Sequence, residues 1–158
     1  MRIRWAPVPG PLGAQVIVAE IGLDMTRFPT PARLVSWVKI CPRTVQSGAK
    51  LRFGTPGRGN PYLKGALGEA AAAAARTDTF LGERYRRLVK RRGKLTALVA
   101  IARSILVTVW DLLIDPTARF HDLGVDYYTS KINTQRRIRA HIPQLAALGY
   151  TVSLETAA

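Results

Sequence analysis

The longest apolar run of the chain, residues 95–114 (LTALVAIARSILVTVWDLLI), limits the folds open to this sequence more than any other segment. The run is long enough to span a bilayer, but Arg103 and Asp111 lie within it. Its polar residues recur at helical spacing along one side: Ser104, Thr108, Asp111 and Asp115. We therefore expect a largely buried helix of a soluble domain, around which the other helices pack, and no membrane span.

Capping residues predict where two further helices begin. The pairs Thr30–Pro31 and Asn60–Pro61 each place a capping side chain directly before a proline, which is favoured at the first position of a helix. The first of these helices would gather Leu34, Trp37 and Val38 on one apolar face. Helices are therefore expected from about residues 31 and 61.

Glycines predict where two other helices end. Residues 6–22 indicate a Pro/Gly turn followed by a short helix that stops at Gly22, and residues 78–92 indicate a helix that stops at Gly93. The stretch 7–22 fits the second half of a helix-hairpin-helix as well as it fits an ordinary tight turn.

The C-terminal residues complete a mostly α prediction. Residues 132–148 have a helical pattern interrupted by Pro143, and residues 150–154 alternate as a short strand does. The expected fold is a compact helical bundle with a helix-hairpin-helix-like entry segment, a long glycine-rich basic loop at 41–60 and a short C-terminal strand. We expect the entry segment to occupy residues 1–25 and the helical domain residues 26–158.

The charge of the chain indicates its partner. The sequence has 24 Lys and Arg against 10 Asp and Glu, for a net charge of +14. Such an excess is typically neutralised by nucleic acid phosphates, whereas no lipidation motif points to a membrane. The single cysteine, Cys41, cannot form an internal disulfide, which favours a reducing, cytoplasmic location.

Metal ligands do not cluster in the sequence. His121 and His141 are the only histidines, neither is spaced for zinc with Cys41, and the acidic residues are scattered. A two-metal nuclease needs converging carboxylates, which this pattern does not indicate. We therefore expect no metal site and no cofactor in this chain.

Basic residues crowd one predicted helix and the start of the next: Arg84, Arg86, Arg87, Lys90, Arg91, Arg92 and Lys94. Glu83, directly before this run, is the one acidic residue that could compensate its charge. We expect these side chains to contact nucleic acid phosphates, and a merely solvated helix face is the alternative.

Ser47 lies in the predicted loop directly before Gly48 and three residues before Lys50. Lys50, Arg52 and Arg58 would give the loop a positive field, and such a field lowers the cost of forming a serine alkoxide that attacks phosphorus. From residue types alone, a nucleophile and a plain turn both stay open.

The order of the motifs resembles the C-terminal half of one group of bacterial insertion-sequence transposases. The resemblance is carried by AEIGLDMTRFPTPARLVSWVKICP, QSGAK, GRGNPYLKGALGEAA, YRRLVKRRGKLTALVAIARSILVTVWDLL and the tail RRIRAHIPQLAALGYTVSLETAA. It runs from about Ala6 to the C-terminus. In APVPGPLGA, Pro7 and Gly10 match the family's hairpin turn, and Val8 replaces its usual glycine.

The resemblance implies a mechanism that composition does not. These transposases combine an N-terminal RNase H-like DEDD domain with a C-terminal domain whose serine forms a phosphoserine with DNA, and they are bridge-RNA-guided recombinases. The matching serine is Ser47. By the same resemblance, a divalent metal, expected to be Mg²⁺, belongs to the DEDD domain. We expect that domain to be supplied in cis or in trans, in an oligomer that holds DNA and guide RNA.

The sequence therefore predicts the serine-bearing C-terminal domain of a DNA transposase that is inactive without its DEDD domain. A basic module that binds nucleic acid without catalysis, as a remnant or a regulator, is the alternative. A shortened gene product, one half of a split gene and an isolated domain all fit the resemblance.

Overall fold

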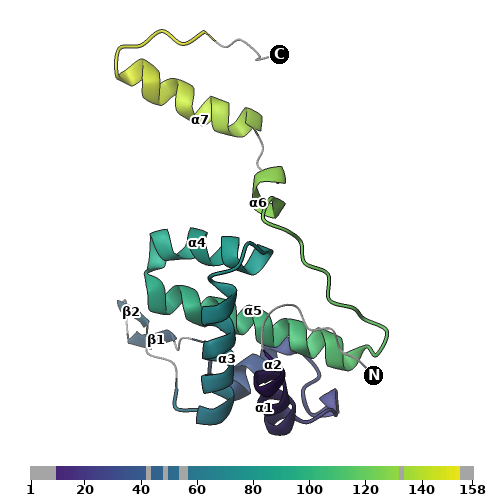
Figure 1. The fold of residues 1–158 in the computed structure, drawn as a ribbon. Coiled ribbons are helices and arrows are strands. Elements are labelled where there is room, and N and C mark those ends of the chain that lie inside the picture. Colours follow the sequence, from purple (N-terminus) through teal and green to yellow (C-terminus); the bar gives the residue numbers. More distant parts are fainter. Residues whose placement is uncertain (1–9, 42–43, 48–49, 54–56, 132–133, 154–158) are drawn as a thin grey trace. The chain divides into compact units, whose positions relative to one another are not determined.

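A computed structural model of the chain (Figure 1) describes residues 10–41, 44–47, 50–53, 57–131 and 134–153. The chain divides into two compact units, Met1–Val125 and Asp126–Ala158. Residues 1–25 and 26–125 share the first unit, so the predicted boundary at residue 25 does not coincide with this division.

The described part of the first unit is mostly helical, as predicted, with one two-stranded hairpin. Its elements are α1 (Pro11–Ile21), the 3-10 turn η1 (Met25–Arg27), α2 (Pro31–Val38), β1 (Thr44–Ser47), β2 (Lys50–Phe53), α3 (Pro61–Ala74), α4 (Phe80–Arg92) and α5 (Lys94–Ile114).

The predicted caps are confirmed. The Thr30 hydroxyl accepts a hydrogen bond from the Arg33 N–H at 3.4 Å at the start of α2, and Asn60 Oδ1 accepts one from the Leu63 N–H at 3.1 Å at the start of α3. Helices α1 and α4 end before glycines in positive-φ conformations, as expected.

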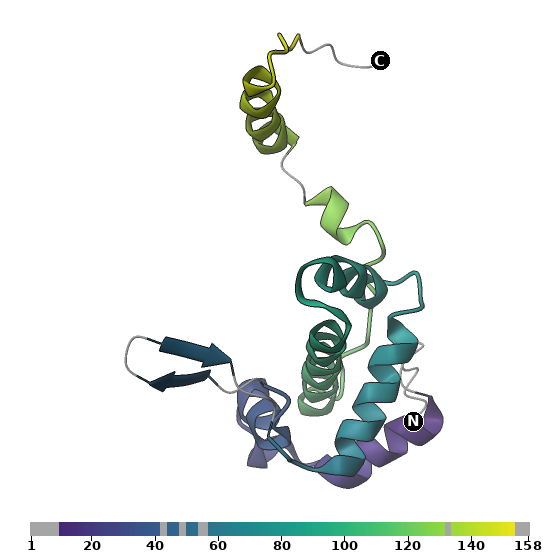
Figure 2. The same ribbon diagram turned by 90° about the vertical axis from the view of Figure 1, so that its left-hand side faces the viewer.

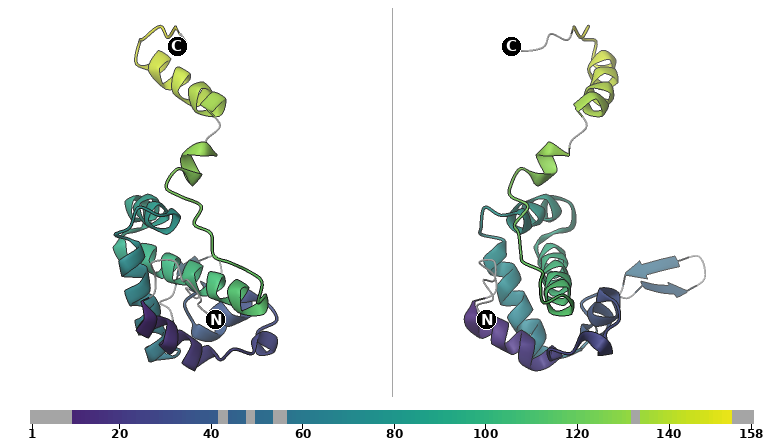
Figure 3. Two further views of the ribbon diagram at one scale, coloured as in Figure 1. Left: turned by 45° about the vertical axis from the view of Figure 1, so that its right-hand side comes forward. Right: turned by 90° about the vertical axis from the view of Figure 1, so that its right-hand side faces the viewer.

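Helix α5 is the centre of the first unit. It contacts α2, α3 and α4, and Figures 2 and 3 show it between α2 and α3, while α1 packs against α3. The core residues of α5 are Ala97, Ile101, Ala102, Ile105, Leu106 and Val109. Among the described residues, α5 is the one helix long and apolar enough to cross a membrane. Only 33% of its apolar window is buried, so the prediction of a largely buried helix is wrong in part, although three helices pack against it.

The predicted glycine-rich loop at 41–60 is wrong in part, because residues 44–47 and 50–53 pair as an antiparallel hairpin. Each strand is only four residues long, and β1 and β2 pair only with each other. Residues 50–53 (KLRF) do alternate polar and apolar side chains, but residues 44–47 (TVQS) alternate less clearly, and four residues are the shortest run that indicates a strand.

The second unit is described by itself. It contains α6 (Tyr127–Ser130) and α7 (Thr134–Ala147), and Pro143 lies inside α7 without ending it. The strand predicted at 150–154 is wrong over its described residues, because residues 150–153 form no strand. The alternation had no partner strand to pair with in the described part of this unit.

The helix-hairpin-helix prediction cannot be followed through its turn, because residues 1–9 lie outside the described residues. Its second half corresponds to α1, which begins at Pro11 after Gly10.

Candidate functional site

The hairpin brings Ser47 and Lys50 to directly opposed positions. Ser47 ends β1, Lys50 begins β2, and the two residues are register partners, while Arg52 is opposite Val45. Gly48 and Ala49, which connect them in the sequence, lie outside the described residues. Figure 2 shows the hairpin projecting from the helices beside α2. The candidate nucleophile therefore lies at the end of a protruding element, with a lysine across from it.

The segments before and after the hairpin make a close backbone contact at Val38 and Gly59. Gly59 has φ +49°, and a Cβ atom there would overlap the backbone carbonyl of Val38 at the end of α2. The absence of a side chain lets the returning segment pass directly against the departing one. We call residues Val38–Cys41 and Gly57–Lys64 the hairpin base.

Two side-chain hydrogen bonds tie residues 57–60 of the hairpin base to helices α3 and α1. The Lys64 ammonium of α3 donates to the Gly57 carbonyl. The Asn60 amide donates to the Glu20 carboxylate of α1 while its oxygen caps α3. Glu20 thus helps to hold the hairpin base against α1.

Positive charge is concentrated at the hairpin base. Two effects lower the pKa of Lys64 below its usual range. The larger is partial burial of its ammonium, and the smaller is repulsion by the nearby Lys39 ammonium. Lys64 also borders a cavity of about 170 Å³, whose other lining residues are Ile40, Gly68, Leu98, Val99 and Ala102. Arg58, predicted to support the serine, is exposed in the same segment. An anion bound here would relieve the repulsion between Lys39 and Lys64.

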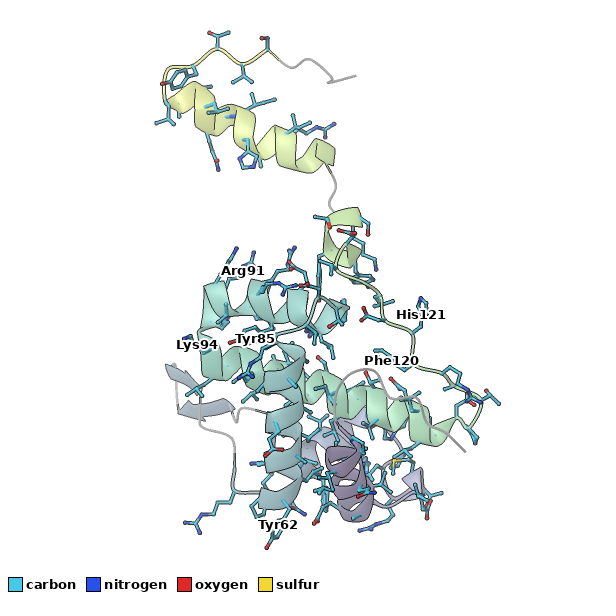
Figure 4. All side chains as sticks on the ribbon, viewed as in Figure 1. Tyr62, Tyr85, Arg91, Lys94, Phe120 and His121 are labelled. Carbon is cyan, nitrogen blue, oxygen red and sulfur yellow. The ribbon has the colours of Figure 1, made fainter. Side chains whose placement is uncertain are left out.

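The basic residues of α4 and the start of α5 do not form one uniform surface. Arg86 binds the Glu83 carboxylate at 3.0 Å, lies 3.5 Å from Asp78 and donates to the Thr77 carbonyl at 3.4 Å. Arg86 therefore stabilises the start of α4. Arg84 is half-buried, whereas the remaining residues are exposed: Arg87, Lys90, Arg91, Arg92 and Lys94. Arg91 and Lys94 are labelled in Figure 4.

The predicted residues thus occupy separate elements. The hairpin leaves the helices beside α2, whereas α4 packs against α5. Sequence reasoning missed Lys39 and Lys64. One signal was available for Lys64: it lies four residues after the cap Asn60, and helical side chains lean toward the N-terminus of their helix.

Two acidic residues of the described chain stabilise local turns. Asp24 and Asp115 have lowered pKa values because they accept hydrogen bonds from Thr26 and Thr117. Burial raises the pKa of Asp111. Within the described ranges, no three His, Cys, Asp or Glu side chains gather as a metal site would require.

Comparison with known proteins identifies one family. The model of the Transposase IS116/IS110/IS902 family matches residues 2–86, more than half of the chain. The match includes the hairpin, the hairpin base and the first part of α4. The chain matches no curated protein and no solved structure at a significant level.

Proposed function

Because the chain belongs to the IS116/IS110/IS902 transposase family, we propose that it is the serine-bearing part of a DNA transposase and that Ser47 is its nucleophile. Family membership makes the chain part of a DNA transposition enzyme and implies that it binds DNA. The observation that supports the finer proposal is the opposition of Ser47 and Lys50 at the end of the projecting hairpin, inside the family match.

The proposed step is a transesterification at phosphorus. The Ser47 oxygen forms a bond to the phosphorus of a DNA phosphodiester, and the bond from phosphorus to one deoxyribose oxygen breaks. The serine proton passes to a base or to solvent, and the departing sugar oxygen takes up a proton. The product is a phosphoserine that conserves the energy of the diester for rejoining.

The basic residues around Ser47 have distinct proposed roles. Lys50 faces Ser47 in the register, and Arg52 and Arg58 would hold the scissile or a neighbouring phosphate. Positive groups near the phosphate stabilise the charge that develops on its oxygens. The hairpin base supports this arrangement, since a projecting nucleophile acts efficiently only when its attachment holds it in position.

The exposed basic residues of α4 and α5 would hold DNA or guide RNA through phosphates. The excess of positive charge and the exposure of Lys90, Arg91 and Lys94 support this role.

The proposed active assembly contains more than this chain. A DEDD domain in cis or in trans, a guide RNA and further copies of the chain complete it. Divalent metal would be held by the DEDD carboxylates, and since the described residues gather no ligand group, no step is assigned to a metal in this chain.

A reconstituted reaction tests the role of Ser47. The chain is combined with a matching DEDD domain, guide RNA, Mg²⁺ and labelled DNA, and products are separated on denaturing gels. We expect a protein–DNA adduct that mass spectrometry assigns to Ser47, and no adduct from the chain alone. Ser47→Ala removes the attacking oxygen and should reduce the adduct to background, with the melting temperature retained.

Ser104→Ala is the matched control, because the Ser104 hydroxyl is used within α5, where it donates to the Ala100 carbonyl at 2.9 Å. This variant should form the adduct normally. An adduct that persists in Ser47→Ala, or that maps to another residue, would show that the nucleophile is misassigned. The DEDD domain used should be one that is active with its own serine domain. If that domain forms no adduct with this chain, the result favours the alternative, a module that binds nucleic acid without catalysis.

A further inference from the structure

The outer side of α2 presents an aromatic ring among basic residues. Trp37 is 42% exposed, although the sequence pattern placed it on the buried face with Leu34 and Val38. Arg33 lies one turn before it on the same helix and is exposed. Lys39, directly after α2, is also exposed. The surface formed by Arg33 and Trp37 is called the α2 platform, and Lys39, two residues after Trp37, belongs to the adjoining hairpin base.

The Trp37 ring packs against the buried side chain of Phe28. Its centroid lies 5.4 Å from that of Phe28, with the two planes at 55°, and Phe28 is buried. The Phe28 carbonyl in turn accepts a hydrogen bond from Trp110 Nε1 of α5 at 2.8 Å. A half-exposed aromatic ring backed by the core is preorganised for a flat partner, since binding would order little further.

The charge around the ring favours an anionic partner. Arg33 and Lys39 have no ion pair among the described residues. Arg27 lies 5.8 Å from the Phe28 ring, and its charge is partly offset by Asp24, whose pKa it helps to lower. Unpaired cations beside an exposed indole match the two parts of a nucleotide, its phosphate and its base.

The α2 platform is continuous with the hairpin base. Lys39 follows Val38, whose carbonyl meets Gly59, and the Lys39 ammonium is close enough to Lys64 to help lower its pKa. The chain reaches β1 five residues after Lys39. A strand of nucleic acid that presents a phosphate to the hairpin can therefore continue across α2.

We propose that the α2 platform binds an unpaired stretch of the DNA strand beside the phosphodiester presented to Ser47. One base stacks on Trp37, and Arg33 and Lys39 contact the flanking phosphates. DNA is the committed partner because the platform adjoins the hairpin, whose proposed substrate is DNA. The inference rests on the proposed function for that choice. It requires an unpaired strand because the bases of a duplex are stacked on one another and cannot cover the ring.

The test measures binding of the full chain to labelled single-stranded DNA, to the same strand with abasic sites, to duplex DNA and to single-stranded RNA. Trp37→Ala should weaken binding of single-stranded DNA roughly five- to a hundredfold, the range found for loss of one stacked base. The effect should be much smaller on the abasic strand and on duplex DNA. Trp37→Phe, which keeps a ring, should retain most of the affinity.

Two controls separate stacking from charge and from folding. Tyr150→Ala removes another exposed aromatic ring, in the second unit and outside the hairpin base, and should leave binding unchanged. Arg33→Ala and Lys39→Ala should each lower the slope of log affinity against log salt by about one unit, whereas Trp37→Phe should not change it. Melting temperatures identify any variant that fails to fold.

The outcomes are distinguishable from those of the adduct experiment, since this binding needs no Ser47 hydroxyl. If Trp37→Ala and Trp37→Phe fold and bind single-stranded DNA as tightly as the wild type does, the inference is overturned. The role of Ser47 is not affected by that result. An equal loss on intact and abasic strands overturns the stacking contact. A loss confined to RNA overturns the choice of DNA.

Discussion

At the scale of single residues, Gly59 shows how one missing side chain shapes the hairpin base. Its φ of +49° and its approach to the Val38 carbonyl both exclude a Cβ atom. Gly59→Ala should lower the free energy of unfolding by roughly 1–3 kcal/mol, through backbone strain together with displacement of Val38. Urea or thermal unfolding measures the change.

Gly65→Ala provides the matched control for Gly59→Ala. Gly65 lies exposed inside α3, and an added Cβ would meet nothing within 4 Å. Alanine there should raise stability by about 0.5–1 kcal/mol, because it restricts the unfolded chain and favours the helix. If Gly59→Ala unfolds no earlier than the wild type, the hairpin base does not hold the close contact described above.

At the scale of elements, α4 combines structural and nucleic-acid-binding positions on one helix. Lys90 and Arg91 are exposed in its last turn. Changing both to Ala should lower the slope of log affinity against log salt by about two units, since each phosphate contact releases counterions. The cost in stability should be modest, about 0.3–1 kcal/mol for each charge lost near the helix C-terminus. Titrations of DNA and of a folded RNA at several salt concentrations provide the measurement.

Arg86→Ala is the opposite case on the same helix. It breaks the pairing with Glu83 and Asp78 and the bond to Thr77, so the melting temperature should fall while the salt slope stays close to that of the wild type. If the slope of log affinity against log salt is unchanged in the Lys90/Arg91 double variant, the last turn of α4 faces solvent and does not contact nucleic acid.

At the scale of the whole molecule, the described core belongs to the first unit. Its buried apolar residues run from Ala14 to Val109, and the segment after α5 is tied back by Asp122, which accepts a hydrogen bond from the Phe80 N–H at 3.2 Å. A chain that ends at Val125 keeps all of these contacts. Its thermal unfolding, followed by circular dichroism, should remain cooperative with a midpoint close to that of the full chain. A large drop in that midpoint would mean that residues 126–158 stabilise the first unit.

The sequence by itself determined what depends on near neighbours in the chain and on total charge. The caps Thr30 and Asn60, the stops Gly22 and Gly93 and the apolar length of α5 each act within a few residues, so they are readable without a fold. The order of the motifs also sufficed for the transposase resemblance, which the family match over residues 2–86 confirms. Ser47 was chosen from that resemblance, and its role stays a prediction.

Only the tertiary structure decided which residues distant in the sequence meet. Asn60 reaches Glu20 across 40 positions, and the Trp110 indole reaches the Phe28 carbonyl across 82. The pairing of β1 with β2 and the exposure of Trp37 likewise depend on contacts with other segments, so no local pattern reveals them. The physical reason is the same in each case: a contact between distant residues forms only after the chain has paid the entropy of closing the loop between them, and the packing of the whole unit decides which closures are stable.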